Sequence, residues 1–251
     1  MSKRLIVNAD DFGFTRDVNE GIVEAHRNGI VTSTTIMANG SAFHHAVILA
    51  KETRSLAVGV HLVLVGERAL SRLGKALPSS PARLVATLAM GGLDVERELD
   101  FQIRRVLNAG IEPSHFDTHK HTHSHPRVAD AVARMVEKHG VHWVRRPLRM
   151  PVFGAMAEKR LRRPGVRMAD HFLGYDLTGR FGVSELERTL RSLPEGITEF
   201  MCHPGLYGEE LRQSRTRLKE SRQRELDALR SPEVKQAVRE SGIELTDYRQ
   251  A

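Results

Sequence analysis

The sequence predicts an α/β fold in which helices flank a parallel sheet that closes wholly or partly into a (β/α) barrel. Two observations carry this prediction. Short apolar runs rich in β-branched residues, typical of buried strands, recur along the whole chain. Segments with the apolar spacing of helices lie between most of them, and strands that alternate with helices form parallel sheets. An open, doubly wound sheet is the alternative for 251 residues.

The predicted strands are the apolar runs that turn residues bound on both sides. They cover residues 4–9, 31–37, 56–64, 113–118, 141–144, 166–172, 197–202 and 243–245. Asp17 is the expected N-cap of the first helix, which Gly29 ends, and Ser41 is the expected N-cap of the second. Later helices are predicted over residues 95–107, 126–138, 184–193 and 218–229.

The loops that follow the strands are where we expect the functional site. In parallel α/β folds the chemistry gathers at the carboxyl ends of the strands. Irregular stretches at residues 65–80, 145–154 and 174–182 are predicted to lie over that face. The chain shows neither an internal repeat nor a low-complexity linker, so we predict a single domain over residues 1–251.

The composition is that of a soluble globular protein, with 40% hydrophobic and 27% charged residues. The net charge of +7 raises the question of nucleic-acid binding. However, the arginines of residues 212–230 are interleaved with Glu220, Glu225 and Asp227, which indicates a solvated helix face. Because few aromatic residues are available for stacking and no nucleic-acid motif is present, no nucleic-acid partner is predicted.

The cysteine count and the hydropathy pattern favour a cytoplasmic protein. Cys202 is the one cysteine of the sequence, which excludes a disulfide framework and a thiolate zinc cluster and fits a reducing compartment. The apolar run at residues 5–7 is too short for a signal sequence. No window approaches the ~20 apolar residues of a membrane span.

Two adjacent aspartates, Asp10 and Asp11, follow the first predicted strand. Like charges at the end of a buried strand repel each other unless a cation lies beside them. A divalent ion removes that cost if one carboxylate binds the ion and the other reaches the attacking water. The alternative is that one of the two caps the next helix or closes the turn at residues 12–13.

Histidines are concentrated after the fourth predicted strand. Wherever this segment is extended, six alternate residues face one side, namely His115, Asp117, His119, His121, His123 and His125. Neutral imidazole is the commonest metal ligand and suits proton transfer near neutral pH. His125, beside Pro126, is equally suited to cap a helix. His61, within the third strand, is either a metal ligand or a hydrogen-bonded core histidine.

One carboxylate and two imidazoles from three strands would form a metal site of the catalytic kind. Such a set leaves coordination positions open for water and substrate, which a structural site does not need. Oxygen and nitrogen ligands of this kind accept zinc, magnesium, manganese, cobalt or nickel.

Five motifs, in this order, resemble the YdjC-like carbohydrate deacetylases, which include the chitooligosaccharide deacetylases. The motifs are residues 8–13 (NADDFG), 28–35 (NGIVTSTT), 59–62 (GVHL), 117–123 (DTHKHTH) and 201–204 (MCHP). They span nearly the whole chain, which makes their combination far more specific than any one of them. The resemblance implies an α/β fold of the distorted (β/α) barrel type, related to the polysaccharide deacetylase and glycoside hydrolase barrels.

The resemblance also implies a metal-dependent hydrolase that removes an N-acetyl group from an amino sugar. It implies one divalent metal ion, Mg or Zn with Mn, Co or Ni as alternatives, held by Asp11, His61 and His119. Asp10 then corresponds to the catalytic base of the family. The chain departs from the chitooligosaccharide branch at Lys120, directly after the second histidine ligand, and in its middle region.

Protonation of the amine leaving group requires an acid. His203 is the expected proton donor, with His121 and His123 as second candidates. Asp117 is expected to orient a ligand imidazole through its other ring nitrogen. The alternative for His203 is that it merely ends a strand before the turn at residues 204–205.

Residues 117–123 and 174–193 resemble the branch linked to hopanoid biosynthesis, whose expected substrate is an N-acetylglucosaminyl lipid. The mixture of basic and apolar residues at 145–168 fits peripheral contact with the inner face of an anionic membrane, and equally an ordinary solvated loop and helix. The expected partners are therefore an amino sugar, lipid-linked or a chitooligosaccharide, and a second copy of the chain in a homodimer.

Two other functions use similar residues. A metal-dependent phosphoesterase would usually bind two metal ions, and a second set of acidic ligands is not evident in the sequence. A non-catalytic carbohydrate-binding barrel would not need a base beside the metal, so the pair Asp10 and Asp11 favours an enzyme.

Overall fold

The computed structural model describes residues 2–72, 74–148 and 153–251. The chain divides into two compact units, each with most of its contacts within itself. Unit 1 consists of Met1–Ile36, Ser41–Val58 and Ala169–Ala251, and unit 2 of Met37–Gly40 and Gly59–Met168. The single domain over residues 1–251 stays a prediction.

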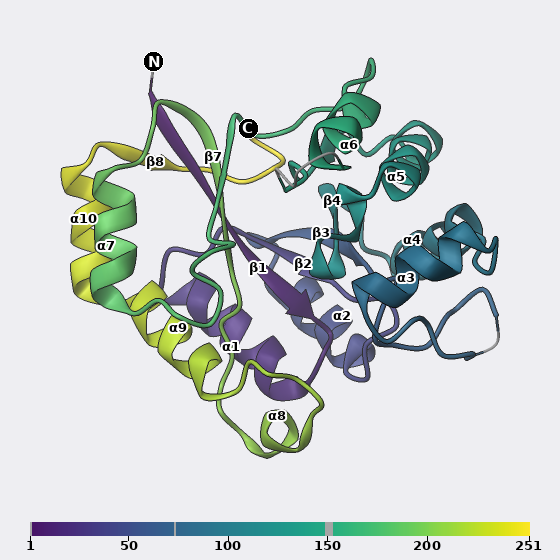
Figure 1. Ribbon diagram of the computed structural model, residues 1–251. Helices are drawn as coiled ribbons and strands as arrows, with labels where there is room; N and C mark the ends of the chain where they lie inside the picture. The colour runs from purple at the N-terminus through teal and green to yellow at the C-terminus, as the bar shows by residue number, and fades with distance from the viewer. Residues whose placement is uncertain (1, 73, 149–152) are drawn as a thin grey trace. The chain divides into compact units, whose positions relative to one another are not determined.

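Unit 1 is built on parallel strands (Figure 1). Its strands are β1 (Lys3–Phe12), β2 (Ser33–Ile36), β6 (His171–Leu173), β7 (Gly196–Cys202) and β8 (Ile243–Leu245). β1 pairs in parallel with β2, β7 and β8, and β6 pairs in parallel with β7. Residues 5–12 of β1 are buried, because the strand lies among several neighbours and its side chains are mostly apolar.

The helices of unit 1 are α1 (Arg16–Arg27), α2 (Phe43–Glu52), α7 (Val183–Arg191), α8 (Glu209–Gln213), α9 (Glu220–Arg230) and α10 (Pro232–Glu240). The predicted cap of α1 is wrong by two residues. Thr15 is extended and its hydroxyl accepts the Val18 N–H at 3.2 Å, whereas the Asp17 carboxylate accepts the Leu211 N–H at 2.8 Å. Ser41 is not the cap of α2 either, because its hydroxyl donates to the carbonyl oxygen of Phe14.

Unit 2 also has parallel strand pairs. Its strands are β3 (Ala57–Leu62), which begins in unit 1, β4 (His115–Thr118) and β5 (Trp143–Val144). Its helices are α3 (Pro81–Ala89), α4 (Val95–Asn108), the 3-10 helix η1 (His119–Ser124), α5 (Pro126–His139) and α6 (Phe153–Leu161). β4 pairs in parallel with β3 and β5. His125 caps α5, since its ring accepts the Arg127 N–H at 3.3 Å and Pro126 takes the first helical position.

The α/β class with parallel strands is confirmed, and each predicted strand overlaps an observed one. Helices α3, α8 and α10 were not predicted, and α6 lies in the segment 145–168, for which a solvated loop and helix is one of the two alternatives. Two of the unpredicted helices carry start signals that the apolar spacing alone does not reveal, a serine N-cap followed by a proline at Ser80 and Ser231. None of the described helices combines the length and the apolar character that crossing a membrane requires.

Candidate functional site

The carboxyl end of β1 is irregular where the two aspartates lie. The parallel register with β2 shifts between Ala9 and Phe12, and Asp11 has φ of +71°. A non-glycine residue in this left-handed region is held there by its surroundings at a cost on the order of 1 kcal/mol or more. The bulge breaks the strict alternation of the strand, so both carboxylates are placed by tertiary contacts. Asp10 and Asp11 are only 2% and 4% exposed.

Arg222 of α9 forms a buried ion pair with Asp11. Its Nη2 lies 2.5 Å from Asp11 Oδ2, and Arg222 is 1% exposed. This corrects the prediction of a solvated helix face at residues 212–230, because Arg222 and Glu225 point into unit 1. The charge pattern was misleading because the carboxylate that neutralises Arg222 belongs to a distant strand. Local spacing along α9 does not reveal such a partner.

Asp10 and His203 come together in unit 1. Ala9 and Cys202 are register partners in the parallel pair of β1 and β7, so the residues that follow them leave the sheet side by side. His203 Nε2 lies 4.0 Å from Asp10 Oδ2, and Asn8 Nδ2 donates to Asp10 Oδ1 at 3.0 Å. The predicted base and the predicted acid are therefore neighbours.

Glu225 holds the backbone that carries His203. Its two carboxylate oxygens accept the N–H groups of His203 at 2.6 Å and of Gly179 at 2.8 Å. Burial raises the pKa of the Glu225 carboxyl to about 7, against the opposing effect of these hydrogen bonds and of Arg222 and Arg224. The charge pattern predicts Glu225 on a solvated helix face, which is wrong, and its spacing along α9 gives no signal of its role.

In unit 2, His61 and Asp117 are register partners of the parallel pair of β3 and β4. His61 Nδ1 lies 2.7 Å from Asp117 Oδ1, and Arg145 Nη1 lies 2.8 Å from Asp117 Oδ2, with all three side chains buried. An ionised carboxylate only accepts hydrogen bonds. Asp117 accepts from the Arg145 guanidinium at Oδ2 and from the His61 ring at Oδ1, so the hydrogen of the neutral His61 ring is on Nδ1. Its Nε2 therefore presents a lone pair. The role of Arg145 was not foreseen.

His119 lies next to that lone pair. Its Nδ1 is 3.2 Å from His61 Nε2, and the two rings are inclined by 75°. Two imidazole nitrogens bound to one ion at about 2.0–2.1 Å, with angles from octahedral to tetrahedral, lie about 2.9–3.4 Å apart. The two histidines thus have the spacing and the donor atoms that a shared divalent ion requires.

The segment after His119 turns instead of continuing the strand. β4 ends at Thr118, and Lys120 and His121 have φ of +54° and +51°. The predicted one-sided arrangement of alternate residues therefore holds only as far as residue 118. His123 is fully buried against Thr118, whose Oγ1 lies 2.6 Å from its Nδ1.

The environment of His123 disfavours its charged form. Burial, and after it the positive charge of Arg145, lowers the pKa of His123 to about 3. His123 is therefore neutral near pH 7, which makes it a poor candidate for the proton donor.

The basic segment that was considered for membrane contact is largely ion-paired in unit 2. Arg146 lies 2.6 Å from Glu158, Arg160 lies 3.1 Å from Asp130, and Arg163 also pairs with Asp130. These contacts support an ordinary loop and helix. Arg149, Met150 and Val152, which belong to the same predicted segment, lie outside the described residues.

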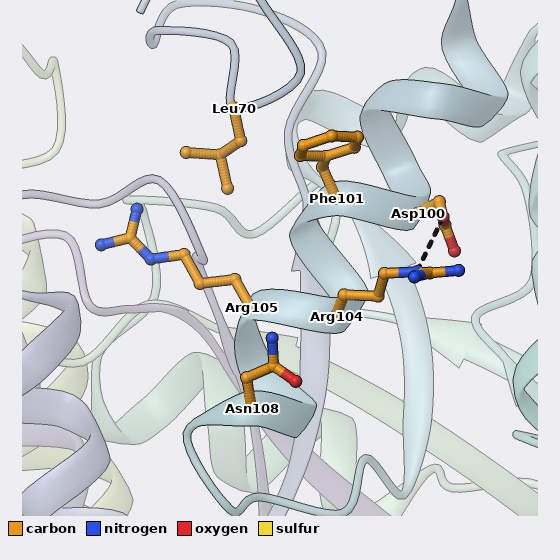
Figure 2. A pocket seen from close by; sticks show the side chains of 6 residues that line it. All are labelled: Leu70, Asp100, Phe101, Arg104, Arg105 and Asn108. Carbon is orange, nitrogen blue, oxygen red and sulfur yellow. Dashed lines mark ion pairs between the residues drawn. The ribbon is translucent and has the colours of Figure 1, made fainter. Parts of the chain in front are cut away.

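A pocket of about 520 Å³ lies on α4 (Figure 2). It is lined by Leu70, Asp100, Phe101, Arg104, Arg105 and Asn108. Phe101 forms an apolar wall, and Arg104 pairs with Asp100 at 2.9 Å. Since none of the predicted site residues lines it, this pocket is separate from the chemistry described above.

A family model described as "YdjC-like protein" matches residues 4–240. A carbohydrate deacetylase of Brevibacillus brevis is 36% identical, with 98% of each chain covered. A carbohydrate deacetylase of Geobacillus stearothermophilus is 37% identical, and the match covers all of this chain and 98% of that protein.

Two solved structures have backbones similar to that of this chain over nearly its whole length. A putative cellobiose-phosphate cleavage protein from Enterococcus faecalis V583 has a TM-score of 0.84 at 28% identity and covers 99% of this chain and 98% of its own. A lactam utilization protein from Thermus thermophilus has a TM-score of 0.53 at 17% identity, covers 98% and 99%, and shares the fold. The predicted fold class, α/β of the distorted (β/α) barrel type, is confirmed.

Proposed function

The chain belongs to the YdjC-like family, and from this premise we propose that it is a carbohydrate deacetylase that hydrolyses the N-acetyl group of an amino sugar. The names of its relatives support the substrate class. The observation that carries the proposal is the buried series Arg145, Asp117 and His61, which presents an imidazole nitrogen 3.2 Å from that of His119.

One divalent ion, Mg or Zn with Mn, Co or Ni as alternatives, is the proposed cofactor, with Asp11, His61 and His119 as its ligands. The donor set fits, because a carboxylate and two neutral imidazoles suit these ions and leave positions open. When bound, the ion would polarise the acetyl carbonyl and lower the pKa of water. Asp117 and Arg145 fix the tautomer of His61.

Asp10 is the proposed base. As water attacks the carbonyl carbon, Asp10 takes its proton, and Asn8 holds the carboxylate in place by its hydrogen bond to Oδ1. His203 is the proposed acid. It gives a proton to the amide nitrogen as the C–N bond breaks, so the products are acetate and the free amine. His121 is the second candidate for this donor.

The sugar and its aglycone are open between two proposed substrates. One is an N-acetylglucosaminyl lipid of the hopanoid type, which would bring the enzyme to the inner face of the membrane. The other is a chitooligosaccharide. The ion pairs of Arg146 and Arg160 reduce the charge available for an anionic membrane and so favour a substrate taken from solution.

The test measures acetate released by the metal-reconstituted protein from the N-acetylglucosaminyl lipid and from N,N′-diacetylchitobiose. Asp11→Asn is the better inactive variant, because its amide oxygen can still accept from Arg222, whereas Asp11→Ala would leave the buried guanidinium with neither carboxylate nor acceptor there, at a cost of about 3–5 kcal/mol. Asp227→Asn, at an exposed position of α9, is the matched control. Release of no acetate from either substrate by a metal-loaded, folded protein would contradict the proposal. A phosphatase assay on the same sample tests the phosphoesterase alternative.

A further inference from the structure

The inner face of α9 contacts Asp11 at the end of β1 and the segment that follows β7. The carbonyl oxygen of Arg222 accepts the Gly205 N–H at 3.2 Å, and Gln223 Oε1 accepts the Tyr207 N–H at 3.1 Å. Glu225 accepts the His203 N–H. α9 thus helps to order residues 203–207, and its Arg222 side chain contacts Asp11.

The ion pair of Arg222 is not explained by stability. The guanidinium lies over the Phe14 ring at 5.8 Å, and neither its Nε nor its Nη1 has a hydrogen-bond partner among the described residues. Buried ion pairs on average gain little or nothing over an apolar pair of the same shape, because desolvation offsets the attraction. Among the described residues, one Asp11 oxygen and the Phe14 ring compensate the burial of Arg222, so it costs more than a hydrophobic residue would. Its effect on Asp11 is the more direct reason for its position.

We propose that Arg222 is a positioning residue that orients Asp11 for metal binding. This inference rests on the proposed function, in which Asp11 is a ligand. By binding Oδ2, Arg222 fixes the rotation of the carboxylate and stabilises the strained backbone at residue 11. Oδ1 is thereby presented in one direction. A ligand that is ordered before the ion arrives loses less conformational freedom on binding, which raises the affinity.

If charge alone determined the metal affinity, Arg222 would lower that affinity instead of raising it. A guanidinium close to the site repels a cation, so its removal would strengthen metal binding if charge dominated. The sign of the change in affinity therefore distinguishes positioning from simple charge.

The experiment titrates metal-free protein with Zn²⁺ by isothermal calorimetry. Arg222→Met should weaken zinc binding by about 10- to 100-fold, and Arg222→Lys should recover part of the loss. Arg230→Met, at an exposed arginine of the same helix that pairs with Glu24, should bind as the wild type does. Unchanged or tighter binding by Arg222→Met overturns the inference, and so does a wild-type protein that binds no zinc.

A folding control is needed because Arg222→Met leaves Asp11 buried without its counter-charge. If that variant is unfolded by circular dichroism, the folded Arg222→Lys protein decides the matter. Lysine keeps the charge of arginine but lacks its planar fork. Positioning therefore predicts that Arg222→Lys binds zinc more weakly than the wild type, whereas charge alone predicts no change in zinc affinity. Acetate release is measured separately. Absence of acetate with the zinc effect intact would refute the proposed function but not the role of Arg222.

Discussion

Two buried arginines each hold one carboxylate of the proposed site. Arg222 pairs with Asp11 in unit 1, and Arg145 pairs with Asp117 in unit 2. Asp11 is proposed to bind the metal ion itself. Asp117 is proposed to act on the ion indirectly, through its contact with His61. At the scale of single residues, the proposed chemistry therefore depends on how these two arginines hold the carboxylates.

Asp117→Asn should weaken zinc binding by about 10- to 100-fold. The amide does not carry the negative charge that strengthens the hydrogen bond from His61 and balances Arg145, so the imidazole becomes a poorer ligand. Calorimetric titration of the metal-free protein measures the change. Asp130→Asn, which removes surface ion pairs in the same unit, serves as the control. Equal affinity in wild type and Asp117→Asn would refute this role.

Glu225→Gln should change how stability depends on pH. The folded-state pKa of Glu225, about 7, is raised above the ordinary value of 4.5 for a glutamate side chain. The folded protein therefore holds this proton more tightly than the unfolded chain does. The resulting stabilisation is fully present below pH 4.5 and is lost as the pH rises through 7.

Urea unfolding at pH 5 and at pH 8 measures this effect. Between these values the unfolding free energy of the wild type should fall relative to that of Glu225→Gln by about 1–3 kcal/mol, since one pKa unit corresponds to about 1.4 kcal/mol. Glu225→Gln has no titratable side chain at position 225, and the two proteins share all their other titratable groups. Parallel pH curves for the two proteins would show that Glu225 does not titrate in this range.

At the scale of elements, the segment that carries His203 is held between α1 and α9. α9 contributes Glu225 and the Arg222 carbonyl, as described above. On α1, a Cβ added at Gly21 would lie 2.4 Å from Gly205 Cα and 2.6 Å from the Leu206 nitrogen. Both contacts are to backbone, which has no flexible end to move away. α1 therefore approaches residues 205–206 so closely that only glycine fits at position 21.

Gly21→Ala should lower the unfolding free energy by about 1–3 kcal/mol and reduce acetate release, because overpacking displaces the segment that follows His203. Denaturant unfolding and the deacetylation assay measure the two effects. Glu20→Ala, at the adjacent exposed position, is the control. On helix propensity alone, alanine would stabilise α1, so a more stable and fully active Gly21→Ala protein would contradict the close packing.

At the scale of the whole molecule, the proposed function couples metal binding to folding. An ion that binds only the folded protein stabilises it by mass action. Under the proposed function, metal occupancy is thus part of the stability of the entire chain.

Removal of the metal should lower the melting temperature. At a free zinc concentration 100 times the dissociation constant, the stabilisation is about 2.7 kcal/mol, and a chelator should abolish it. Thermal unfolding with and without EDTA measures the difference. Asp11→Asn should show little response to either addition. A wild-type melting curve that is the same with zinc and with EDTA would contradict the proposed ligand set.

The sequence by itself determined the strands and the residues at their ends. Buried apolar runs and turn residues are local signals, and the short motifs placed Asp10, Asp11 and His119 at strand ends and His61 within a strand, without any knowledge of contacts. The family followed from the order of these motifs, and the comparison with known proteins confirmed it.

Only the tertiary structure decided which charges are buried and what holds the ligands. Arg222 and Asp11 are 211 positions apart, and nothing in the local pattern of α9 separates Arg222 from its solvated neighbours. The burial of a charge depends on its partner, and the partner is chosen by the fold. The turn at Lys120 and His121 is likewise set by backbone angles that the alternation of histidines does not encode.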